Sequence, residues 1–325
     1  SPIGVLNGQY KHMRPEILGS QVIDEIINRY TISHIDGIFC GNAVGTGGNL
    51  GRLMGLMCNL PNSVPAITVD MQCASALMSI EIAYAHIVSG IMDSAIAGGI
   101  ESSSLQPERV YASGDDREGA YKVAQFTPQD QSHLAMLEGA ERTIHKHNVT
   151  KEDLYPHIIG SHQRASAALD NPYLQSHIMP ITIDGKRCID ECIRPTMNKK
   201  LLFRMKPLLG ADSITNAGNA CLTHDGAAFV YLSNKKGPFK IHSVKPWAGN
   251  PQFSPEGALE STEAILKRTG LTMDDIDVVE WNEAFAIIDV LFDKTYPNHI
   301  GKYNMFGGAL AYGHPYGCSG AILVL

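Results

Sequence analysis

The sequence lacks several features that would place the protein in a special class. No stretch concentrates Lys and Arg, and 26 basic residues stand against 33 acidic ones, for a formal net charge of −7. Binding to a row of phosphates needs such a concentration, so we expect no nucleic-acid partner. No apolar run approaches the roughly 18 residues of a membrane helix, and the opening SPIGVLNGQY does not resemble a secretory signal. We therefore expect a cytoplasmic protein with no membrane contact.

The cysteines also argue against a secreted protein. There are seven, an odd number, without the close spacings of a disulfide framework. A reducing compartment is the simpler interpretation. Cys188 and Cys192 are close in sequence but have no second pair downstream, so we predict no metal site.

Two parts of the chain follow the same order of helix, turn and strand. From Leu18 to Tyr30 apolar residues recur at helical spacing, and HIDGIFCGN (34–42) then supplies a short apolar strand that ends in a polar loop. In the last third, ALESTEAILKRTG (258–270) predicts a second amphipathic helix, closed by Gly270. It is followed by MDDIDVVEWNEAF (273–285), which predicts a second strand.

These two parts are in register with one another. The dipeptide Ile-Asp recurs after 241 positions, and an asparagine (Asn42, Asn282) recurs after 240. Cys73 and His314 are again 241 positions apart, and each precedes small residues that can begin a tightly packed helix. Short apolar strands can match by chance, but three matches in register favour a duplicated α/β unit. We predict that its two central helices start near each other.

The segment between the two parts has a different composition. From about residue 101 to residue 206 it is rich in charge, His, Gln and Pro, and lacks closely spaced apolar strands. It contains a helical stretch bounded by Asn-Pro and an irregular ribbon at 184–195. We interpret it as an inserted loop domain. Regular structure resumes with a glycine-rich turn and a strand within 214–233.

Cys73 lies before an apolar stretch in VDMQCASALMSI (69–80). Free cysteine is often buried simply by packing, which is one interpretation of this position. The other is nucleophilic catalysis, because a buried helix from Ala74 to Ser89, ended by Gly90, would direct the positive end of its dipole at the thiol. We expect that dipole to lower the pKa of Cys73 from its ordinary value to about 7.

His314 and Asn282 are the candidate partners of this cysteine. His314 precedes a proline in GGALAYGHPYGCSGA (307–321), after a glycine-rich turn that lets backbone approach a ligand. Asn282 and Glu283 follow the second predicted strand, where polar groups of open α/β sheets face the ligand crevice. Each also has a purely structural interpretation, as a turn histidine or a loop-capping asparagine.

Five motifs, in this order, resemble those of the thiolase family, the acetyl-CoA acyltransferases. They are 72–102, which begins QCASALMSI, then DECIRP (190–195), TNAGNACLTHDGAA (215–228), WNEAFA (281–286) and GGALAYGHPYGCSGA (307–321). The resemblance implies an α/β fold with duplicated α-β-α-β-α layered halves and an inserted loop domain. It assigns 1–101 and 207–234 to the N-terminal half, 102–206 to a coenzyme A-binding loop domain, and 235–325 to the C-terminal half.

The resemblance also implies the chemistry. Cys73 would be acylated, and His314 would keep it deprotonated. With a water held by Asn282, His314 would form an oxyanion hole, and the backbone N–H of Cys73 would contribute to the other. The implied reaction cleaves a 3-ketoacyl-CoA with coenzyme A, or condenses two acetyl-CoA to acetoacetyl-CoA, as part of lipid and fatty acid metabolism.

Coenzyme A is implied as a substrate, with no permanently bound cofactor and no metal. Its phosphates and adenine favour a cation, and its pantetheine arm favours an apolar tunnel. Arg194 matches the family position that lies against the adenine. Met136, Ala217 and Leu209 match positions along the arm, where Cys221 replaces an expected serine. The resemblance further implies a homodimer or homotetramer.

The sequence departs from the family pattern in several places. The second reactive cysteine of thiolases, in a C-terminal CxGxG motif, and the first β-strand of the family do not occur here, and we expect both in a longer protein. Ala76 replaces a glycine, and Cys318 replaces a small residue. Two alternatives therefore stay open: a catalytically impaired thiolase-like acyl-CoA-binding protein, and a β-ketoacyl synthase-type condensing enzyme.

Overall fold

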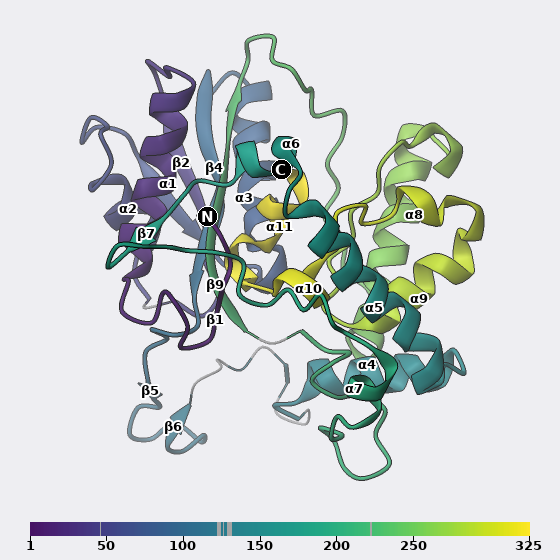
Figure 1. The fold of residues 1–325 in the computed structure, drawn as a ribbon. Helices are drawn as coiled ribbons and strands as arrows, with labels where there is room; N and C mark the ends of the chain where they lie inside the picture. The colour runs from purple at the N-terminus through teal and green to yellow at the C-terminus, as the bar shows by residue number, and fades with distance from the viewer. Residues whose placement is uncertain (46, 122–124, 126, 129–131, 222) are drawn as a thin grey trace.

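A five-stranded mixed sheet organises the computed structural model, which describes residues 1–325 except 46, 122–124, 126, 129–131 and 222. Its strand order is β1-β9-β4-β2-β3. β2 (Gly37–Gly41) is parallel to β3 (Ala66–Val69) and to β4 (Ser94–Ser102). β9 (His224–Ser233) is antiparallel to β4 and to β1 (Gly4–Val5). Figure 1 shows the sheet beside a group of helices that includes α8 and α9.

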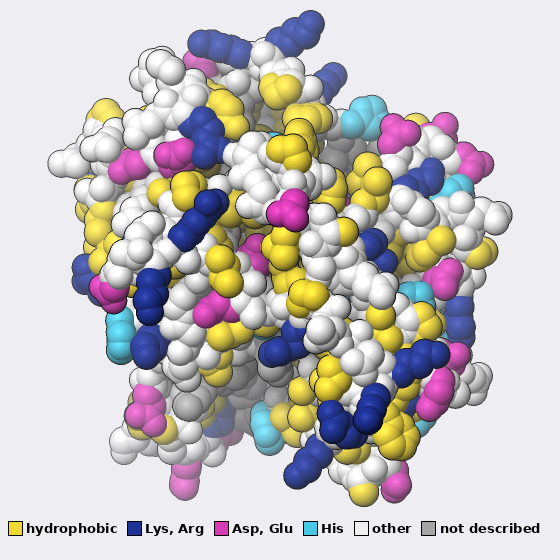
Figure 2. All heavy atoms as spheres, viewed as in Figure 1, with side chains coloured by type: hydrophobic (Ala, Val, Ile, Leu, Met, Phe, Trp, Pro, Cys, Tyr) yellow, Lys and Arg dark blue, Asp and Glu magenta, His cyan; other side chains and the backbone are white. Residues whose placement is uncertain are grey.

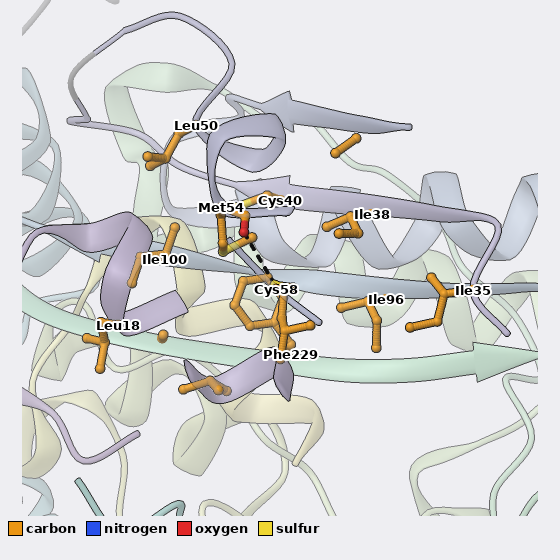
Figure 3. Packing of buried hydrophobic residues seen from close by; sticks show 14 of the residues in the cluster. Leu18, Ile35, Ile38, Cys40, Leu50, Met54, Cys58, Ile96, Ile100 and Phe229 are labelled. Carbon is orange, nitrogen blue, oxygen red and sulfur yellow. Dashed lines mark hydrogen bonds between the residues drawn. The ribbon is translucent and has the colours of Figure 1, made fainter. Parts of the chain in front are cut away.

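Helices cover both faces of this sheet. α1 (Pro15–Arg29) and α2 (Leu50–Gly55) pack on one face, and α3 (Ser75–Val88) and α11 (Tyr316–Val324) on the other. Side chains of a strand alternate between faces, and here large ones point to α1 and α2 while small ones mostly point to α3 and α11. The first set includes Ile38, Ile96, Ile100 and Phe229 (Figure 3), and the second Ala95, Ala97 and Ala228.

The small residues let α11 approach the backbone of the sheet. A Cβ atom at Gly99 in β4 would lie 1.9 Å from the carbonyl oxygen of Gly317 in α11, and one at Gly41 would lie 2.5 Å from the same oxygen. No side chain fits in either place. The first turn of α11 therefore packs directly against the backbone near the ends of β2 and β4.

Several predicted elements are confirmed. α1 matches the helix predicted from Leu18 to Tyr30 except at its last residue, and β2 lies within the segment 34–42 predicted as a strand. α8 (Gly257–Thr269) is closed by Gly270 as predicted, and the φ of this glycine, 72°, is left-handed. The helix predicted from Ala74 to Ser89 is formed as α3, but the prediction that it is buried is only partly correct. The most extensive contacts of α3 are with the sheet and α11, and Leu77 and Val88 are 43% and 67% exposed.

The C-terminal part is mainly helical. It contains η2 (Pro251–Glu256), α8, η3 (Met273–Asp275), α9 (Ala286–Thr295), η4 (Pro297–Lys302), α10 (Ala309–Tyr312) and α11. The predicted strand at 273–285 is not formed. Val279 makes one parallel bridge to Tyr303, because no segment of residues 235–325, all of which are described, extends the pairing into a ladder.

The segment between the two parts is more helical than predicted. It contains the short strands β5 (Arg109–Val110) and β6 (Ala120–Tyr121), and the helices α4 (Ala135–Lys146), α5 (Lys151–Ala168), α6 (Pro172–His177) and α7 (Lys199–Phe203). The expected irregular ribbon begins as a hairpin of β7 (Thr182–Ile183) and β8 (Lys186–Arg187). α5 starts with a capping box between Thr150 and Asp153, and it packs against α9 and α10.

No helix among the described residues is both long and apolar enough to cross a membrane. All seven cysteines are free thiols.

Candidate active site

The two predicted helix starts lie together in the structure. Cys73 lies in the 3-10 turn η1 (Gln72–Ala74), two residues before α3, and His314 lies two residues before α11. α11 packs against both η1 and α3. Contact is close, because a Cβ atom at Gly320 would lie 2.8 Å from the backbone nitrogen of Leu77. The cysteine and histidine that are 241 positions apart in sequence thus occupy equivalent places at two adjoining helix ends.

A constrained turn presents Cys73. Gln72 has a left-handed backbone with φ of 49°, which is strained for a residue with a side chain. Its N–H donates to Oδ1 of Asp70 at 2.9 Å. The hydroxyl of Ser75 accepts from the N–H of Met71 and donates to the carbonyl of Gln72, at 2.9 and 2.6 Å. These bonds hold the strand-turn-helix connection that places the thiol at the start of α3.

The predicted lowering of the thiol pKa is wrong. Burial raises the pKa of Cys73 to about 12, and the carboxylate of Glu101 adds to the effect. Desolvation and a nearby negative charge both disfavour the thiolate, and here they outweigh the helix end. Cys73 is therefore a thiol at neutral pH and needs a base to become a nucleophile.

His314 has one ring nitrogen available as that base. Its Nδ1 lies 2.6 Å from the hydroxyl oxygen of Ser319, and this hydroxyl donates its proton to the carbonyl of Pro315 at 2.9 Å. Nδ1 must therefore carry the proton and donate to Ser319, so Nε2 is unprotonated. Burial, with the nearby His224, lowers the pKa of His314 to about 3. The imidazole is neutral at physiological pH.

Asn282 lies next to the basic nitrogen, and its neighbour Glu283 is firmly anchored. The Asn282 amide Nδ2 donates to His314 Nε2 at 3.1 Å. The fully buried carboxylate of Glu283 accepts from the Ser161 hydroxyl at 2.6 Å and from the Asn304 amide at 2.9 Å. These bonds of Glu283, to Ser161 in α5 and to Asn304 before α10, fix the backbone that carries the neighbouring Asn282.

Glu101 is a site residue that sequence reasoning missed. It is fully buried at the end of β4 and accepts hydrogen bonds from the Asn42 amide and from the N–H groups of Ala43, Val44 and Gly317. Burial raises its pKa to about 7 against the effect of these donors. It joins the end of β2 to the first turn of α11. A glutamate directly after the small apolar run SAIAGGI was the available signal.

Cys221 also lies in this region. It is half-buried, and its thiol donates to the carbonyl of Glu283 at 2.8 Å. Burial raises its pKa far above the ordinary value, and the nearby groups that add to this include Cys192 and Cys73. The hydrogen bond of the thiol joins Cys221 to the segment before α9 that carries Asn282 and Glu283.

The residues expected along coenzyme A lie on connected elements. Leu209 lies in a short loop closed by the bridge between Pro207 and Asn216, and Ala217 directly follows that bridge. Glu141 connects this loop to α4, the helix that also carries Met136. Its carboxylate accepts hydrogen bonds from the backbone N–H groups of Ile214 and Thr215, both at 2.8 Å. Arg194 is exposed, and its backbone N–H donates to Nδ1 of His162.

Metal ligands are not gathered anywhere in the described part of the chain, where no three His, Cys, Asp or Glu side chains form a candidate site. The chemistry available is that of a thiol, a neutral imidazole, an amide and backbone N–H groups. This set suits transfer of an acyl group through a thioester.

Residues 1–236 match the family described as "Thiolase, N-terminal domain", and residues 239–325 match "Thiolase, C-terminal domain". The chain belongs to the thiolase family. It is an enzyme, an acyltransferase of the thiolase type, and the matches favour neither a β-ketoacyl synthase nor a non-catalytic binding protein.

Curated relatives include VraB of Staphylococcus epidermidis and of Staphylococcus aureus strain MSSA476, both named for acetyl-CoA C-acetyltransferase. They are 32% identical over 339 residues and 33% identical over 336 residues, which cover 99% of this chain and 87% and 88% of those proteins.

Solved structures confirm the predicted thiolase-like α/β fold. The acetyl-CoA acetyltransferase of Bacillus anthracis superposes with a TM-score of 0.88 at 25% identity, over all of this chain and 88% of that one. Human mitochondrial 3-ketoacyl-CoA thiolase in complex with CoA gives 0.87 at 26% identity, over all of this chain and 87% of that one.

Proposed function

We propose that this thiolase carries acyl groups on Cys73, with His314 as the base and coenzyme A as the acceptor. The observation that carries the proposal is the tautomer of His314. Its Nδ1 donates to Ser319, which leaves an unprotonated Nε2 at the start of a helix packed on the Cys73 turn. A buried thiol with a raised pKa becomes a nucleophile only beside such a base.

In the cleavage direction, Nε2 of His314 takes the proton of the Cys73 thiol. The sulfur attacks the 3-keto carbon of a 3-ketoacyl-CoA, and the bond between carbons 2 and 3 then breaks. Its electron pair goes to carbon 2, which takes up a proton to give acetyl-CoA. The thiol of a second coenzyme A then attacks the acyl-Cys73 thioester and releases the shortened acyl-CoA. The reverse sequence condenses two acetyl-CoA.

Charge on the carbonyl oxygens would be stabilised by fixed donors. With a water held by Asn282, protonated His314 would face one thioester oxygen, and the backbone N–H of Cys73, at the start of α3, would face the other. A donor of this kind is worth about 3 kcal/mol in a transition state. The anchored Glu283 supports Asn282 in this role.

Coenzyme A would bind along the elements joined by Glu141. Met136, Leu209, Ala217 and Cys221 line the pantetheine arm in this proposal, and Arg194 contacts the adenine. Cations are abundant nearby: Figure 2 shows Lys and Arg gathered over the region of α7, where the exposed cations are Lys199, Lys200, Arg204 and Lys206. They suit the phosphates of a nucleotide substrate.

We also propose that the enzyme acts in fatty acid metabolism in the cytoplasm, and that it forms a homodimer or a homotetramer. β3 is an edge strand of the sheet, and Ile67 in this strand is 43% exposed. An open edge with apolar side chains suits pairing with a second copy. Light scattering on the purified protein tests the assembly.

The activity is tested by adding acetoacetyl-CoA and free coenzyme A to the enzyme and measuring the loss of absorbance of the magnesium–enolate complex. We expect cleavage by the wild-type enzyme, and an acetyl adduct on the peptide that contains Cys73 after exposure to acetyl-CoA. Cys73→Ala should lose both. Folded protein that forms no adduct and cleaves nothing would support the acyl-CoA-binding alternative instead.

A further inference from the structure

One large side chain stands at the start of α11. The helix begins YGCSGA, in which Tyr316 is followed by five small residues. Contact with the sheet requires small residues here, since a Cβ atom at Gly317 would lie 2.7 Å from the carbonyl oxygen of Ile100. Tyr316 is half-buried, yet it belongs to none of the hydrophobic clusters formed by the described residues. Core packing therefore does not account for its size.

The ring of Tyr316 lies against the imidazole of His314. The two ring centroids are 4.8 Å apart and the ring planes are inclined at 71°, which is an edge-to-face contact. The helix that Tyr316 begins packs against η1, the turn that carries Cys73. Burial raises the pKa of Tyr316, and the nearby Cys73 and Cys221 add to this effect. The ring therefore lies near both residues that the proposed reaction uses.

Protein fills the space on another side of His314. Its backbone N–H donates to Nδ1 of His224 at 3.0 Å, and a Cβ atom at Gly313 would lie 2.4 Å from Cδ2 of the same ring. Beyond that ring, the sulfur of Cys192 lies 2.7 Å from Nε2 of His224. No acyl group can approach the imidazole through these side chains. We therefore expect it to approach from the side on which Tyr316 lies.

The hydroxyl of Tyr316 has no hydrogen-bond partner among the residues that the structure describes. Tyr312, one turn earlier, behaves differently, because its hydroxyl donates to the carbonyl of Phe306 at 2.9 Å. A buried tyrosine hydroxyl usually has such a partner, so that of Tyr316 is left for solvent or for a ligand. This favours a side chain that borders the substrate over one that is packed within protein.

We propose that the ring of Tyr316 is the wall against which the acyl group on Cys73 lies, and that it selects an acetyl group over longer chains. The inference rests on the proposed function and assigns acyl-chain selection in it to one residue. The wall is held in place, because the next residue, Gly317, donates its N–H to the buried carboxylate of Glu101 at 2.9 Å. A fixed aromatic ring beside the sulfur would accept a methyl group and collide with further methylenes.

Acylation of Cys73 by acyl-CoA of two chain lengths isolates this role, since it needs no bond between two carbons. The purified enzyme is mixed with acetyl-CoA or with butyryl-CoA, and the peptide that contains Cys73 is followed over time by mass spectrometry. We expect the wild-type enzyme to react at least about tenfold faster with acetyl-CoA, because one methylene in a closed pocket changes rates by about 10- to 200-fold. Tyr316→Val should reduce this acetyl preference by at least about tenfold, mainly by speeding the reaction with butyryl-CoA.

Further substitutions separate the ring from its hydroxyl and from general effects. Tyr316→Phe keeps the ring and should keep the acetyl preference. Tyr316→Leu frees less space than Tyr316→Val, so its preference should lie between those of the Phe and Val variants, and it replaces the Val variant if that one does not fold. Tyr173→Val is the matched control. Tyr173 also contacts a histidine ring, that of His177, with centroids 4.7 Å apart, but it is 55% exposed on α6, so its loss should leave the preference unchanged.

The outcomes are distinct. A wild-type enzyme that accepts butyryl-CoA as fast as acetyl-CoA overturns the inference, and so do folded Val and Leu variants that keep the wild-type preference. Equal loss of acylation by both acyl-CoAs in Tyr316→Val also overturns it, because the ring would then only support His314. If Tyr316→Phe loses the preference as fully as Tyr316→Val, the ring is not the selecting group. A wild-type enzyme that neither acylates Cys73 nor cleaves acetoacetyl-CoA refutes the proposed function itself, and the inference with it.

Discussion

The side-chain amide of Asn282 donates a hydrogen bond to Nε2 of His314 at 3.1 Å, while Nδ1 of the same ring is occupied by Ser319. The imidazole is therefore held at both nitrogens, with its basic nitrogen facing an amide. Such an arrangement fixes the tautomer and the ring orientation before substrate binds.

Removing the amide should slow the chemistry more than it weakens binding. Asn282→Ala is expected to lower kcat for cleavage of acetoacetyl-CoA by about 100-fold or more, because it removes a donor to the developing charge. Steady-state kinetics measures this, with the exposed Asn298→Ala as the control. An unchanged kcat in Asn282→Ala would show that the amide does not take part.

Ser319→Ala should release the other side of the ring. The buried N–H at Nδ1 of His314 then loses its acceptor, which costs about 1–3 kcal/mol of stability and allows the wrong tautomer. We expect kcat to fall about tenfold with KM little changed. Urea unfolding and kinetics on the same preparation check both effects, and full activity at reduced stability would restrict Ser319 to a structural role.

The alkylation of Cys73 should report its raised pKa. With a pKa of about 12 set by burial, the thiolate fraction rises about tenfold for each pH unit through neutrality. The rate of reaction with iodoacetamide at Cys73, followed by mass spectrometry, should rise accordingly from pH 7 to pH 9. A plateau within that range would mean that the helix end or His314 lowers the pKa after all.

His314 should make the protein less stable in acid. Its folded-state pKa is lowered to about 3 from 6.5 by burial, so the unfolded chain binds a proton that the folded one refuses. Stability is then lost as pH falls below about 6.5, by up to about 1.4 kcal/mol per pH unit. The loss of unfolding free energy between pH 7 and pH 5 should be smaller, by about 2 kcal/mol, in His314→Gln. Equal losses in the two proteins would contradict this.

The close approach of α11 to the sheet predicts an intolerant glycine. A Cβ atom at Gly317 would lie 2.7 Å from the carbonyl oxygen of Ile100 and 2.8 Å from Cα of Asn42, both backbone atoms. Gly317→Ala should therefore destabilise the fold by about 1–3 kcal/mol and lower Tm. Gly257→Ala, where a Cβ atom meets nothing within 4 Å, is the matched control. Equal Tm values for the two variants would refute this account of the helix contact.

Sequence patterns pointed to residues that the structure brings together. The 241-position repeat related Cys73 to His314, and the structure places both two residues before helices that pack together. Motif resemblance supplied Asn282, which bonds to His314. The roles of these residues, the coenzyme A contacts and the domain boundaries stay predictions.

Other features depended on contacts that no local pattern records. Glu101 reads in the sequence as a polar residue at a strand end, yet it is fully buried and binds four donors. The pairing of Cys192 with His224 joins two segments that have no periodic relationship.

By itself, then, the sequence determined which residues begin the two helices and which chemical groups they carry, because hydrophobic spacing, turn residues and motifs are local. Only the tertiary structure decided the protonation states of those groups and their partners. The pKa of a thiol or an imidazole depends on desolvation and on charges brought close by folding, and in this protein burial reversed the direction that the helix end alone predicted for Cys73.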